Sequence, residues 1–379
     1  MKYKLSDCVE IISGGTPKKA VSEYWDGNIP WITIKDFGSK YPKSTDNYIT
    51  QEGLNHSAAK LSKDKDILIS ARGTVGEVMM VHSGYTFNQS IYGLRIKEKV
   101  AIPEYIYYWL LANKQIFIKN VHGSVFDTIT RKIFDHIQIE LPCIANQAEI
   151  VSKLNSIDSK IALNELINDN LSKLQQLNLS QLINRKLYKI VKIGDLEIIV
   201  SDHVANGSFK SLKDNVSYFD NPNYALFIRN IDFKKDLDGN KKYIDKKSYN
   251  YLKKSHLFGG EVVISNVADV GSVHRVPFIK KPMVVGNNQI FIKSKHFSMT
   301  DYLYVYFQSF WGQSSISSIT SGSAQQKFNK TDFRSLEIPI PSEKWIQSNI
   351  SPYVTLQDKI FNENQSLKQI KATLLNHCF

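Results

Sequence analysis

The stretch Asp66–Ser70, with the sequence DILIS, leads to Gly76–Val78, and the chain repeats this pattern later, where Glu261–Ser265, with the sequence EVVIS, leads to Gly271–Val273. Both stretches are short apolar runs followed by a turn with glycine. This pattern is typical of a buried central strand and the loop that follows it. The chain therefore contains at least one strand and loop in two copies.

Further landmarks recur in the same order, at offsets from 195 positions (Gly76 to Gly271) to 200 positions (Gln89 to Gln289). A repeat of this length indicates two whole domains, because the units of a solenoid span only about 20–50 residues. The recurring pairs are Trp31–Phe37 with Phe227–Phe233, Asn88–Ile91 with Asn288–Phe291, Glu104–Tyr107 with Asp301–Tyr304, Gly123 with Gly322, Phe134 with Phe333, and Pro142 with Pro341.

The length and the charge agree with this duplication. A chain of 379 residues predicts two or three domains. The formal net charge is +12, and basic residues outnumber acidic ones by 24 to 19 in residues 1–190 and by 24 to 17 in residues 191–379. A surplus that both halves share favours two contacts with the same polyanion. The alternative is a basic soluble protein without such a partner.

The three cysteines, Cys8, Cys143 and Cys378, show no metal-like spacing, which favours a reducing compartment. Charged residues interrupt the N-terminal segment, and no run approaches the roughly 18 apolar residues of a membrane span. We therefore expect a cytoplasmic protein that has no membrane partner.

Each half begins with short strands and irregular loops and ends in a helical segment, which predicts four parts: 1–142, 143–188, 189–341 and 342–379. Residues 1–142 and 189–341 are the predicted globular domains. In residues 143–188 and 342–379, apolar side chains recur at helical spacing. In the first helix they are Ile150, Leu154, Ile157, Ile161, Ile167, Leu171, Leu174 and Leu177.

A helix of about 40 residues is about 60 Å long, so it cannot bury one narrow apolar seam within a single small domain. We expect it to pair with its own copy in an antiparallel coiled coil, and we expect Asn164 and Asn168 to fix the register. The alternative is two ordinary amphipathic helices, each packed on a separate core.

The sequence resembles the specificity subunits of Type I restriction-modification systems. The resemblance depends on the order and repetition of several weak motifs, and it covers essentially the whole chain. They are Ser13–Pro17, Ile29–Ile32, Ile69–Gly76, Phe87–Ser90, and Ile137–Pro142 leading through Asn146–Val151 into the long helix.

The resemblance implies an α+β protein in which two target-recognition domains are separated by two long helices that form an antiparallel coiled coil with pseudo-twofold symmetry. The protein would be a non-catalytic subunit that reads a bipartite target in double-stranded DNA. Its partners would be two modification (methyltransferase) subunits, which carry the S-adenosylmethionine, and restriction (motor-nuclease) subunits. The chain itself would hold no cofactor. Ser342–Gln347 and Pro352 depart from the motif of the first copy, which puts equal docking of the two modification subunits in question.

Residues that contact DNA are expected in polar loops beside strands, because Lys and Arg bind phosphates whereas Arg, Asn and Gln also read base edges. Arg72 lies in a glycine-containing loop that permits close approach of the backbone. A salt-bridged anchor of that loop is the alternative role for Arg72. The first half supplies the candidates Thr16, Lys18, Lys19, Lys35, Arg72 and Thr74.

The second half differs from the first at the equivalent loops, which would let the two halves read different bases. In contrast, Asn88–Gln89 and Asn288–Gln289 recur in both copies, so we interpret them as scaffold hydrogen-bond clamps. The second half supplies the candidates Arg229, Asn230, Asn266, His274, Arg275, Ser323, Gln325, Gln326 and Lys327.

No catalytic or metal motif stands out. Asn221–Tyr224 resembles the catalytic motif of amino-methyltransferases only in part, and a turn is the simpler interpretation. Gly14–Lys19 lacks the spacing of a phosphate-binding loop, and no histidine pairs with another His or Cys at metal spacing. Two alternatives to a recognition subunit stay open: a stand-alone or fused DNA methyltransferase with an unrecognised active site, and a helical scaffold that binds only protein.

Overall fold

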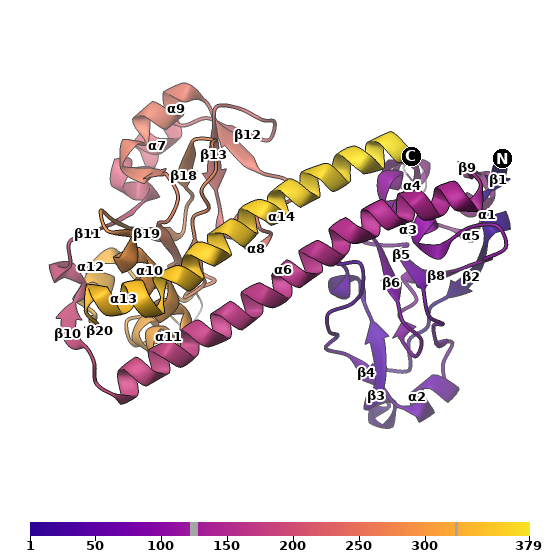
Figure 1. Ribbon diagram of the computed structural model, residues 1–379, viewed down its shortest axis with the longest axis horizontal. Helices are drawn as coiled ribbons and strands as arrows, with labels where there is room; N and C mark the ends of the chain where they lie inside the picture. The colour runs from indigo at the N-terminus through magenta and orange to yellow at the C-terminus, as the bar shows by residue number, and fades with distance from the viewer. Residues whose placement is uncertain (122–127, 323–324) are drawn as a thin grey trace. The chain divides into compact units, whose positions relative to one another are not determined.

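The computed structural model describes residues 1–121, 128–322 and 325–379 (Figure 1). The chain forms two compact units, of which the first comprises residues 1–162 and 366–379 and the second residues 163–365. Each unit therefore contains one copy of the repeat together with part of each long helix. Within the described residues, no helix is both long enough and apolar enough to cross a membrane.

The first unit combines short strands with short helices before its long helix begins. Its elements are β1 (Lys2–Lys4), α1 (Leu5–Cys8), β2 (Val9–Ser13), η1 (Ser22–Tyr24), β3 (Trp25–Ile32), η2 (Ile34–Asp36), β4 (Tyr48–Ile49), α2 (Gln51–Asn55), β5 (Asp66–Ser70), β6 (Val78–Val81), β7 (Thr86–Phe87), β8 (Ile91–Ile96), α3 (Pro103–Ala112), α4 (Lys114–Val121), α5 (Arg131–His136), β9 (Gln138–Glu140) and α6 (Ile144–Asn184).

The second unit contains the rest of α6 and the second copy. Its other elements are β10 (Lys189–Lys192), η3 (Ile193–Asp195), β11 (Ile198–Asp202), η4 (His203–Asn206), α7 (Phe209–Asn215), β12 (Tyr218–Phe219), β13 (Ala225–Ile228), α8 (Asn230–Lys234), β14 (Lys242–Ile244), α9 (Lys246–Tyr251), η5 (Lys253–Ser255), β15 (His256–Leu257), β16 (Val262–Ser265), β17 (Val273–Arg275), β18 (Met283–Val285), β19 (Gln289–Ser294), α10 (Phe297–Gln308), α11 (Phe310–Ser318), α12 (Lys330–Ser335), β20 (Glu337–Ile340), α13 (Glu343–Asn349) and α14 (Ser351–Cys378).

The two units share one sheet topology. The first has a four-stranded sheet in the order β2-β8-β5-β6, and the second has the order β11-β19-β16-β17, with antiparallel neighbours throughout. The two apolar runs that recur in the sequence form β5 and β16, and each lies inside its sheet, as predicted. Side chains on both faces of β5 and β16 are buried, which explains why neither run alternates between apolar and polar residues.

Each unit also has a second sheet, which has three strands in the first unit and five in the second. The strand order is β4-β3-β7 in the first unit and β12-β14-β13-β18-β15 in the second. Both sheets contain one parallel pair, β3 with β7 and β13 with β18. The strands β3 and β13 end directly before the short helices η2 and α8, which begin at Ile34 and Asn230.

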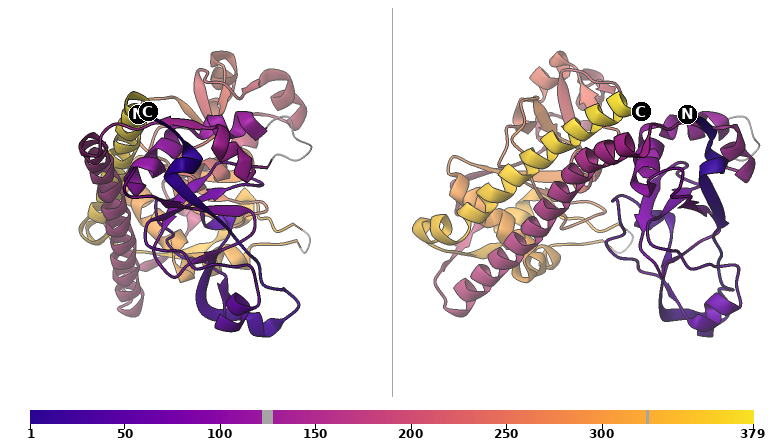
Figure 2. Two further views of the ribbon diagram at one scale, coloured as in Figure 1. Left: turned by 90° about the vertical axis from the view of Figure 1, so that its right-hand side faces the viewer. Right: turned by 45° about the vertical axis from the view of Figure 1, so that its right-hand side comes forward.

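The long helices α6 and α14 lie side by side and run antiparallel, as Figures 1 and 2 show. Residue numbers rise along α6 as they fall along its partner: Asp158 contacts Lys371 in the first unit, and in the second unit Asn164 contacts Asn364 and Gln175 contacts Gln357. The antiparallel helix pair that the sequence predicted is therefore confirmed.

The buried seam of α6 differs from the predicted one. Leu171 is buried, but Leu174 and Leu177 are 43% and 54% exposed, whereas the polar Gln175 is 1% exposed. Periodicity of apolar residues alone misplaced the seam, because two of its positions in the second unit are occupied by the amides Asn164 and Gln175. The leucines that they displace face outward on α6.

The segment after Pro341 forms two helices instead of one. α13 ends at Asn349, and Ile350 leaves helical geometry with φ −123° and ψ −58° before α14 begins. Pro352 is the second residue of α14, a position where its missing N–H costs no helical hydrogen bond. The predicted departure from the first copy is thus a break between helices just before Pro352.

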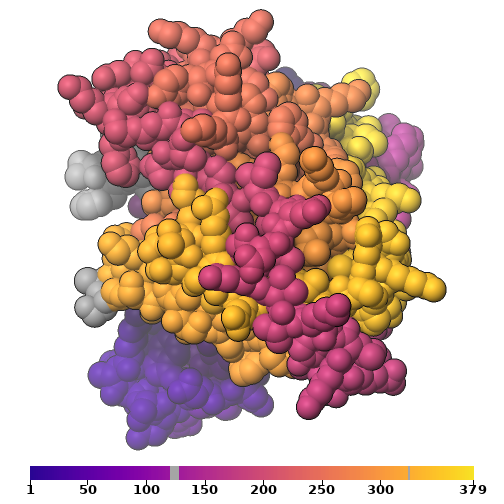
Figure 3. Space-filling view, turned by 90° about the vertical axis from the view of Figure 1, so that its left-hand side faces the viewer, coloured from indigo at the N-terminus to yellow at the C-terminus, as the bar shows by residue number. Residues whose placement is uncertain are grey.

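Figure 3 shows the neighbouring surface of the second unit, where the pink segment that joins α6 to β10 lies beside yellow residues of the last part of the chain.

Candidate nucleic-acid interface

Equivalent loops follow β5 and β16, and their backbones match in detail. The N–H of Gly76 donates to Ser70 O at 2.9 Å, and that of Gly271 donates to Ser265 O at 3.0 Å. Both glycines have positive φ, +81° and +87°, a conformation that residues with a Cβ rarely adopt. The repeat therefore holds two copies of one loop, at residues 71–77 and 266–272, on which different side chains are displayed.

The first loop presents Arg72, Gly73 and Thr74 to solvent. A Cβ built on Gly73 would lie 3.5 Å from Ile34 Cδ1, so the loop lies against η2, on which Lys35 is also exposed. The side chain of Arg72 makes no hydrogen bond or ion pair with the part of the chain that the structure describes. The role of Arg72 as a DNA contact stays a prediction.

Thr16, Lys18 and Lys19 lie after a tightly packed turn. A Cβ at Gly14 or Gly15 would overlap the backbone of Asn88 or of Ala58 and Ala59, so these glycines serve packing. The hydroxyl of Thr16 donates to Gln89 Oε1, which ties the turn to the neighbouring loop. Lys18 and Lys19 follow the turn with exposed side chains.

A cation that sequence reasoning missed lies next to these loops. Arg131, the first residue of α5, donates to Ser13 Oγ at 2.9 Å. The chain just before it runs along the first loop, because the N–H of Ile129 donates to Ala71 O at 2.9 Å. Arg131 therefore adds a positive charge beside this loop, and the partner that the described residues provide is a neutral hydroxyl.

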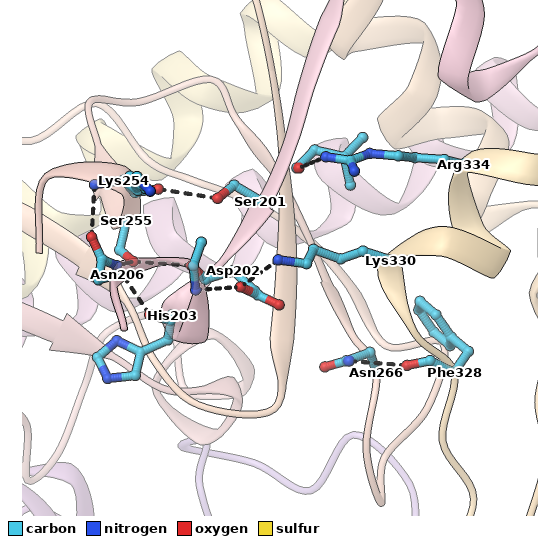
Figure 4. Close-up of polar contacts among 12 residues, drawn as sticks. Ser201, Asp202, His203, Asn206, Lys254, Ser255, Asn266, Phe328, Lys330 and Arg334 are labelled. Carbon is cyan, nitrogen blue, oxygen red and sulfur yellow. Dashed lines mark hydrogen bonds and ion pairs between the residues drawn. The ribbon is translucent and has the colours of Figure 1, made fainter. Parts of the chain in front are cut away.

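The second unit places a cation at the same position but neutralises it. Lys330, the first residue of α12, donates to Asp202 Oδ1 at 2.9 Å, as Figure 4 shows. Lys330 follows Arg131 by 199 positions, the offset between Pro142 and Pro341, and this alignment was the signal that could have identified both residues. Since Asp202 ends β11 as Ser13 ends β2, the equivalent sites differ by one negative charge.

Polar contacts hold the chain beside Asp202 in place. Asn206 donates to His203 O at 3.0 Å and to Ser255 Oγ at 2.5 Å, and its Oδ1 accepts the N–H of Lys254 at 2.9 Å (Figure 4). The side chain of Lys254 is exposed. Burial lowers the pKa of His203, so its ring is neutral near pH 7. This cluster supports the end of β11 and presents Lys254 beside it.

Asn230 and His274 support each other in the second unit. Asn230 donates to Asp269 Oδ2 at 2.5 Å, and its Oδ1 lies 2.8 Å from His274 Nε2. The imidazole stacks on Phe233 with 5.0 Å between ring centroids. Burial, assisted by the charge of Lys234, lowers the pKa of His274 to about 4. A neutral His274 therefore positions Asn230 and contributes no positive charge for phosphates at neutral pH.

Two predicted DNA contacts in the second unit have structural roles instead. Arg275 is 9% exposed and forms ion pairs with Asp301 and Asp358, so its guanidinium faces the protein interior. Arg229 holds Asp232 through two bonds of 2.7 and 2.9 Å and also donates to Asn240 O at 2.8 Å. Because these donors are committed within the protein, we remove both arginines from the candidate interface.

Asn266 is also engaged internally, and it joins two loops. Its side chain donates to Phe328 O at 3.1 Å (Figure 4), and its backbone N–H donates to Asn288 O at 3.1 Å. Gln289, which is 1% exposed, donates to Ile228 O at 3.0 Å. The interpretation as a scaffold clamp is confirmed for Gln289, whereas Gln89 of the first copy is exposed and only accepts a hydrogen bond from Thr16.

The polar loop before α12 lies against the loop after β16. Ser321 and Lys327 exchange two backbone hydrogen bonds of 2.9 Å, and the N–H of Ala268 donates to Gln326 O at 3.1 Å. The side chains of Gln325, Gln326 and Lys327 are exposed. Ser323 lies outside the described residues, as does the segment of the first copy at residues 123–126. The second unit thus brings residues 325–327 together with residues 266–269.

Within residues 1–121, 128–322 and 325–379, no group of three or more His, Cys, Asp or Glu side chains is arranged to hold a metal ion. Asn221 and Tyr224 lie at bends in the irregular stretch before β13, which agrees with a connecting segment, as the sequence predicted. The candidate site consequently consists of exposed cations and amides on two equivalent sets of loops. Such groups bind phosphates and base edges.

Comparison with known proteins places the chain in a family. A model of the Type I restriction modification DNA specificity domain matches residues 1–173 and 186–374. The specificity subunit of the Type I restriction enzyme MjaIX of Methanocaldococcus jannaschii is 28% identical over 177 residues, which are 45% of this chain and 40% of that relative. The EcoR124I/EcoR124II specificity subunit of Escherichia coli is 31% identical over 154 residues, which are 38% of each chain.

Those two alignments span well under half of each relative, whereas the MjaVIII specificity subunit of M. jannaschii is 20% identical over 98% of this chain and 90% of its own length. The crystal structure of a Type-I restriction-modification system S subunit from M. genitalium has the same fold, with a TM-score of 0.54 at 15% identity, and it covers 100% of this chain and 96% of that one. Because the family model matches both copies of the repeat, the chain belongs to the family of the Type I restriction modification DNA specificity domain.

Proposed function

We propose that this protein is the DNA sequence-recognition subunit of a Type I restriction-modification complex, and that it reads a bipartite target in double-stranded DNA with its two units. The observation that carries the proposal is the duplicated loop with unlike side chains. Equivalent backbones at residues 71–77 and 266–272 display Arg72 and Thr74 in one unit and adjoin Gln325 and Gln326 in the other. Loops with the same backbone conformation but different side chains would let the two units read half-sites of different sequence.

The electrostatics of the two units support unequal half-sites. Within the residues that the structure describes, the first unit pairs neither Arg72 nor Arg131 with a carboxylate, whereas Lys330 in the second unit is paired with Asp202. Affinity from phosphate contacts would be larger in the first unit, and the second would depend more on amide contacts to bases. Reading heads on one face of a duplex sit about 34–36 Å apart, or a multiple of this distance, so a split target is the expected form.

The long helices offer a surface for the modification subunits. Leu163, Leu166, Leu174 and Leu177 of α6 are 53%, 60%, 43% and 54% exposed, and we call this group the outer leucine stripe. Exposed leucines at helical spacing are typical of a face that a partner helix covers. We infer that the modification subunits dock here, and that they supply the S-adenosylmethionine and the methyl transfer. The restriction subunit would join through the assembled complex.

Reconstitution tests this function. The purified chain, incubated with S-adenosylmethionine and DNA, is expected to transfer no methyl group, and adding the modification subunit is expected to produce methylation at one split motif. Methyl transfer by the chain alone would contradict the proposal and favour a methyltransferase with its own active site. A complex whose DNA affinity does not fall with rising salt would favour a scaffold that binds only protein.

A further inference from the structure

A buried ion cluster fastens the globular part of the second unit to α14. Arg275 Nε, on β17, lies 3.1 Å from each carboxylate oxygen of Asp358 on α14. The same guanidinium reaches Asp301 of α10 at 2.9 Å and the carbonyl oxygen of Gly260 at 3.3 Å. The side chains of Arg275 and Asp358 are 9% and 19% exposed. One arginine thus holds a sheet, a domain helix and a long helix together.

This contact is directional. A guanidinium offers donors in a fixed planar fork, so it accepts a carboxylate in few orientations. Burial raises the pKa of both Asp358 and Asp301, and the charge of Arg275 opposes that shift. The cluster contains two carboxylates and one guanidinium. Removal of one member would leave the buried charges of the others without their partner, which is costly. The cluster therefore adds a contact of defined orientation to the apolar packing of Val354 of α14 in the domain core.

The first unit holds a carboxylate at the equivalent position of α6. Asp158 precedes Asp358 by 200 positions, which is also the separation of Asn164 and Asn364, the residues that contact each other across the helix pair. The hydroxyl of Tyr108, on α3, lies 2.7 Å from Asp158 Oδ2, and Lys371 of α14 donates to Asp158 Oδ1 at 2.5 Å. Tyr108 is fully buried. In both units, therefore, a side chain of the globular domain bonds an aspartate of a long helix. In the first unit this side chain is the phenol of Tyr108, whereas in the second it is the guanidinium of Arg275.

We propose that Asp158 and Asp358 are positioning residues that fix each DNA-reading unit on its long helix and thereby set the spacing of the two half-sites that the complex accepts. This inference rests on the proposed function. Asp158 lies six positions before Asn164 on α6, and Asp358 lies six positions before Asn364 on α14. With the helical rise of 1.5 Å per residue, each aspartate is about 9 Å along its helix from the asparagine contact. The two aspartates are therefore equivalent with respect to that contact.

The test uses the complete methyltransferase complex and a series of DNA duplexes. The series carries the wild-type target, targets whose spacer is one base pair shorter or longer, and targets with single base changes in either half-site. For Asp358→Ala we expect the preference for the correct spacer to fall about tenfold, because a misplaced reading head costs productive geometry. Discrimination among bases within each half-site should stay unchanged. Asp358→Asn, which keeps an acceptor for Arg275, should retain most of the spacer preference.

Two further variants keep the outcome decisive. Tyr108→Phe removes only the hydroxyl that reaches Asp158 and should relax the spacer preference from the first unit, even if Asp358→Ala proves too unstable to assemble. Asp169→Ala, an exposed aspartate on α6, is the matched control and should behave as wild type. A folded Tyr108→Phe complex that keeps the wild-type spacer profile would overturn the inference, and so would a folded Asp358→Ala complex that keeps it. Lost base discrimination would also overturn it, whereas a wild-type complex without any split-target preference would contradict the proposed function itself.

Discussion

Asn164 Nδ2 donates to Asn364 Oδ1 at 2.7 Å, and these two residues are 200 positions apart in a chain whose halves repeat at offsets of 195 to 200. Residues that the repeat makes equivalent therefore face each other across the helix pair. In two antiparallel helices, such a self-contact marks a local twofold axis. The asparagine predicted to fix the register does contact its own copy.

The first prediction concerns this contact. Asn164 is 1% exposed, so its replacement by Leu removes a buried donor and leaves the half-buried Asn364 Oδ1 and the exposed Glu363 Oε2 without this hydrogen bond. We expect Asn164→Leu to lower the free energy of unfolding by about 1–3 kcal/mol, measured by urea denaturation. Asn164→Leu/Asn364→Leu should recover part of that loss. The control Asn170→Leu, at an exposed position of α6, should change the free energy of unfolding little. Equal stability of Asn164→Leu and wild type would show that the contact does not stabilise the helix pair.

The second prediction concerns the unlike partners of Arg131 and Lys330. Asp202→Asn removes the negative charge but keeps an acceptor for the N–H of Ala205, which lies 2.8 Å away. Lys330 would then be available to a phosphate, and the slope of log affinity against log salt in the assembled complex should steepen by up to about 0.9.

The reciprocal change is Ser13→Asp, which gives Arg131 a carboxylate partner and should make the slope shallower by a similar amount. Lys4→Ala, which removes an exposed cation on β1, is the control and should leave the slope unchanged. Slopes that do not move in opposite directions for Asp202→Asn and Ser13→Asp would exclude these two cations from the DNA interface.

The third prediction is a dependence of stability on pH. The pKa of His274 is lowered to about 4 in the folded state, whereas an unfolded histidine titrates near pH 6.5. Between these values the unfolded state binds more protons, so the contribution of His274 is complete above about pH 6.5 and is lost as pH falls toward 4. Compared with His274→Gln, the wild type should lose about 1–2 kcal/mol more stability between pH 7.5 and pH 5 in urea unfolding.

Other groups near His274 also carry charge, namely Lys234 and Asp269, and both are retained in that comparison. His296→Gln, at an exposed histidine before α10, provides the control for a general effect of losing an imidazole. An identical loss of stability in wild type and His274→Gln would show that His274 does not cause the acid sensitivity.

The fourth prediction concerns the outer leucine stripe. Leu166→Gln combined with Leu177→Gln should weaken binding of the modification subunit at least about tenfold, because burial of apolar surface is the main favourable term in most protein–protein association. Both side chains are more than half exposed, so the thermal stability of the isolated chain should change little. Leu61→Gln, an exposed leucine of the first unit, is the matched control. Undiminished binding by the double variant, measured by calorimetry, would place the docking surface elsewhere.

The sequence predicted the duplicated architecture well, because backbone geometry makes strict demands that survive divergence. The positive φ of Gly76 and Gly271 and the buried runs of β5 and β16 require glycine and apolar residues at fixed positions. The same signals identified the helix pair. They did not predict which face of α6 is buried. Gln175 is buried although it is polar, and Leu174 is exposed although it is apolar, so the pattern of apolar residues indicates the wrong face.

Site residues were predicted less well, because a polar side chain has the same sequence signature whether it faces solvent or another residue. Arg72 is exposed, but Arg275 is enclosed by two aspartates, one of them 83 positions away. Arg131 and Lys330 were missed because each stands at the start of a short helix, away from glycine-rich loops. Only the three-dimensional pairing with Ser13 and Asp202 distinguishes them.

The central claim is that each unit reads its own half of one split target, and methylome sequencing tests it most directly. Cells would carry the wild-type chain, Arg72→Ala in the first unit, or Gln325→Ala with Gln326→Ala in the second. We predict one split methylation motif in the wild type, and altered or weakened base preference in a different half of it for each variant. A continuous motif, or variants that all change both halves together, would contradict the account.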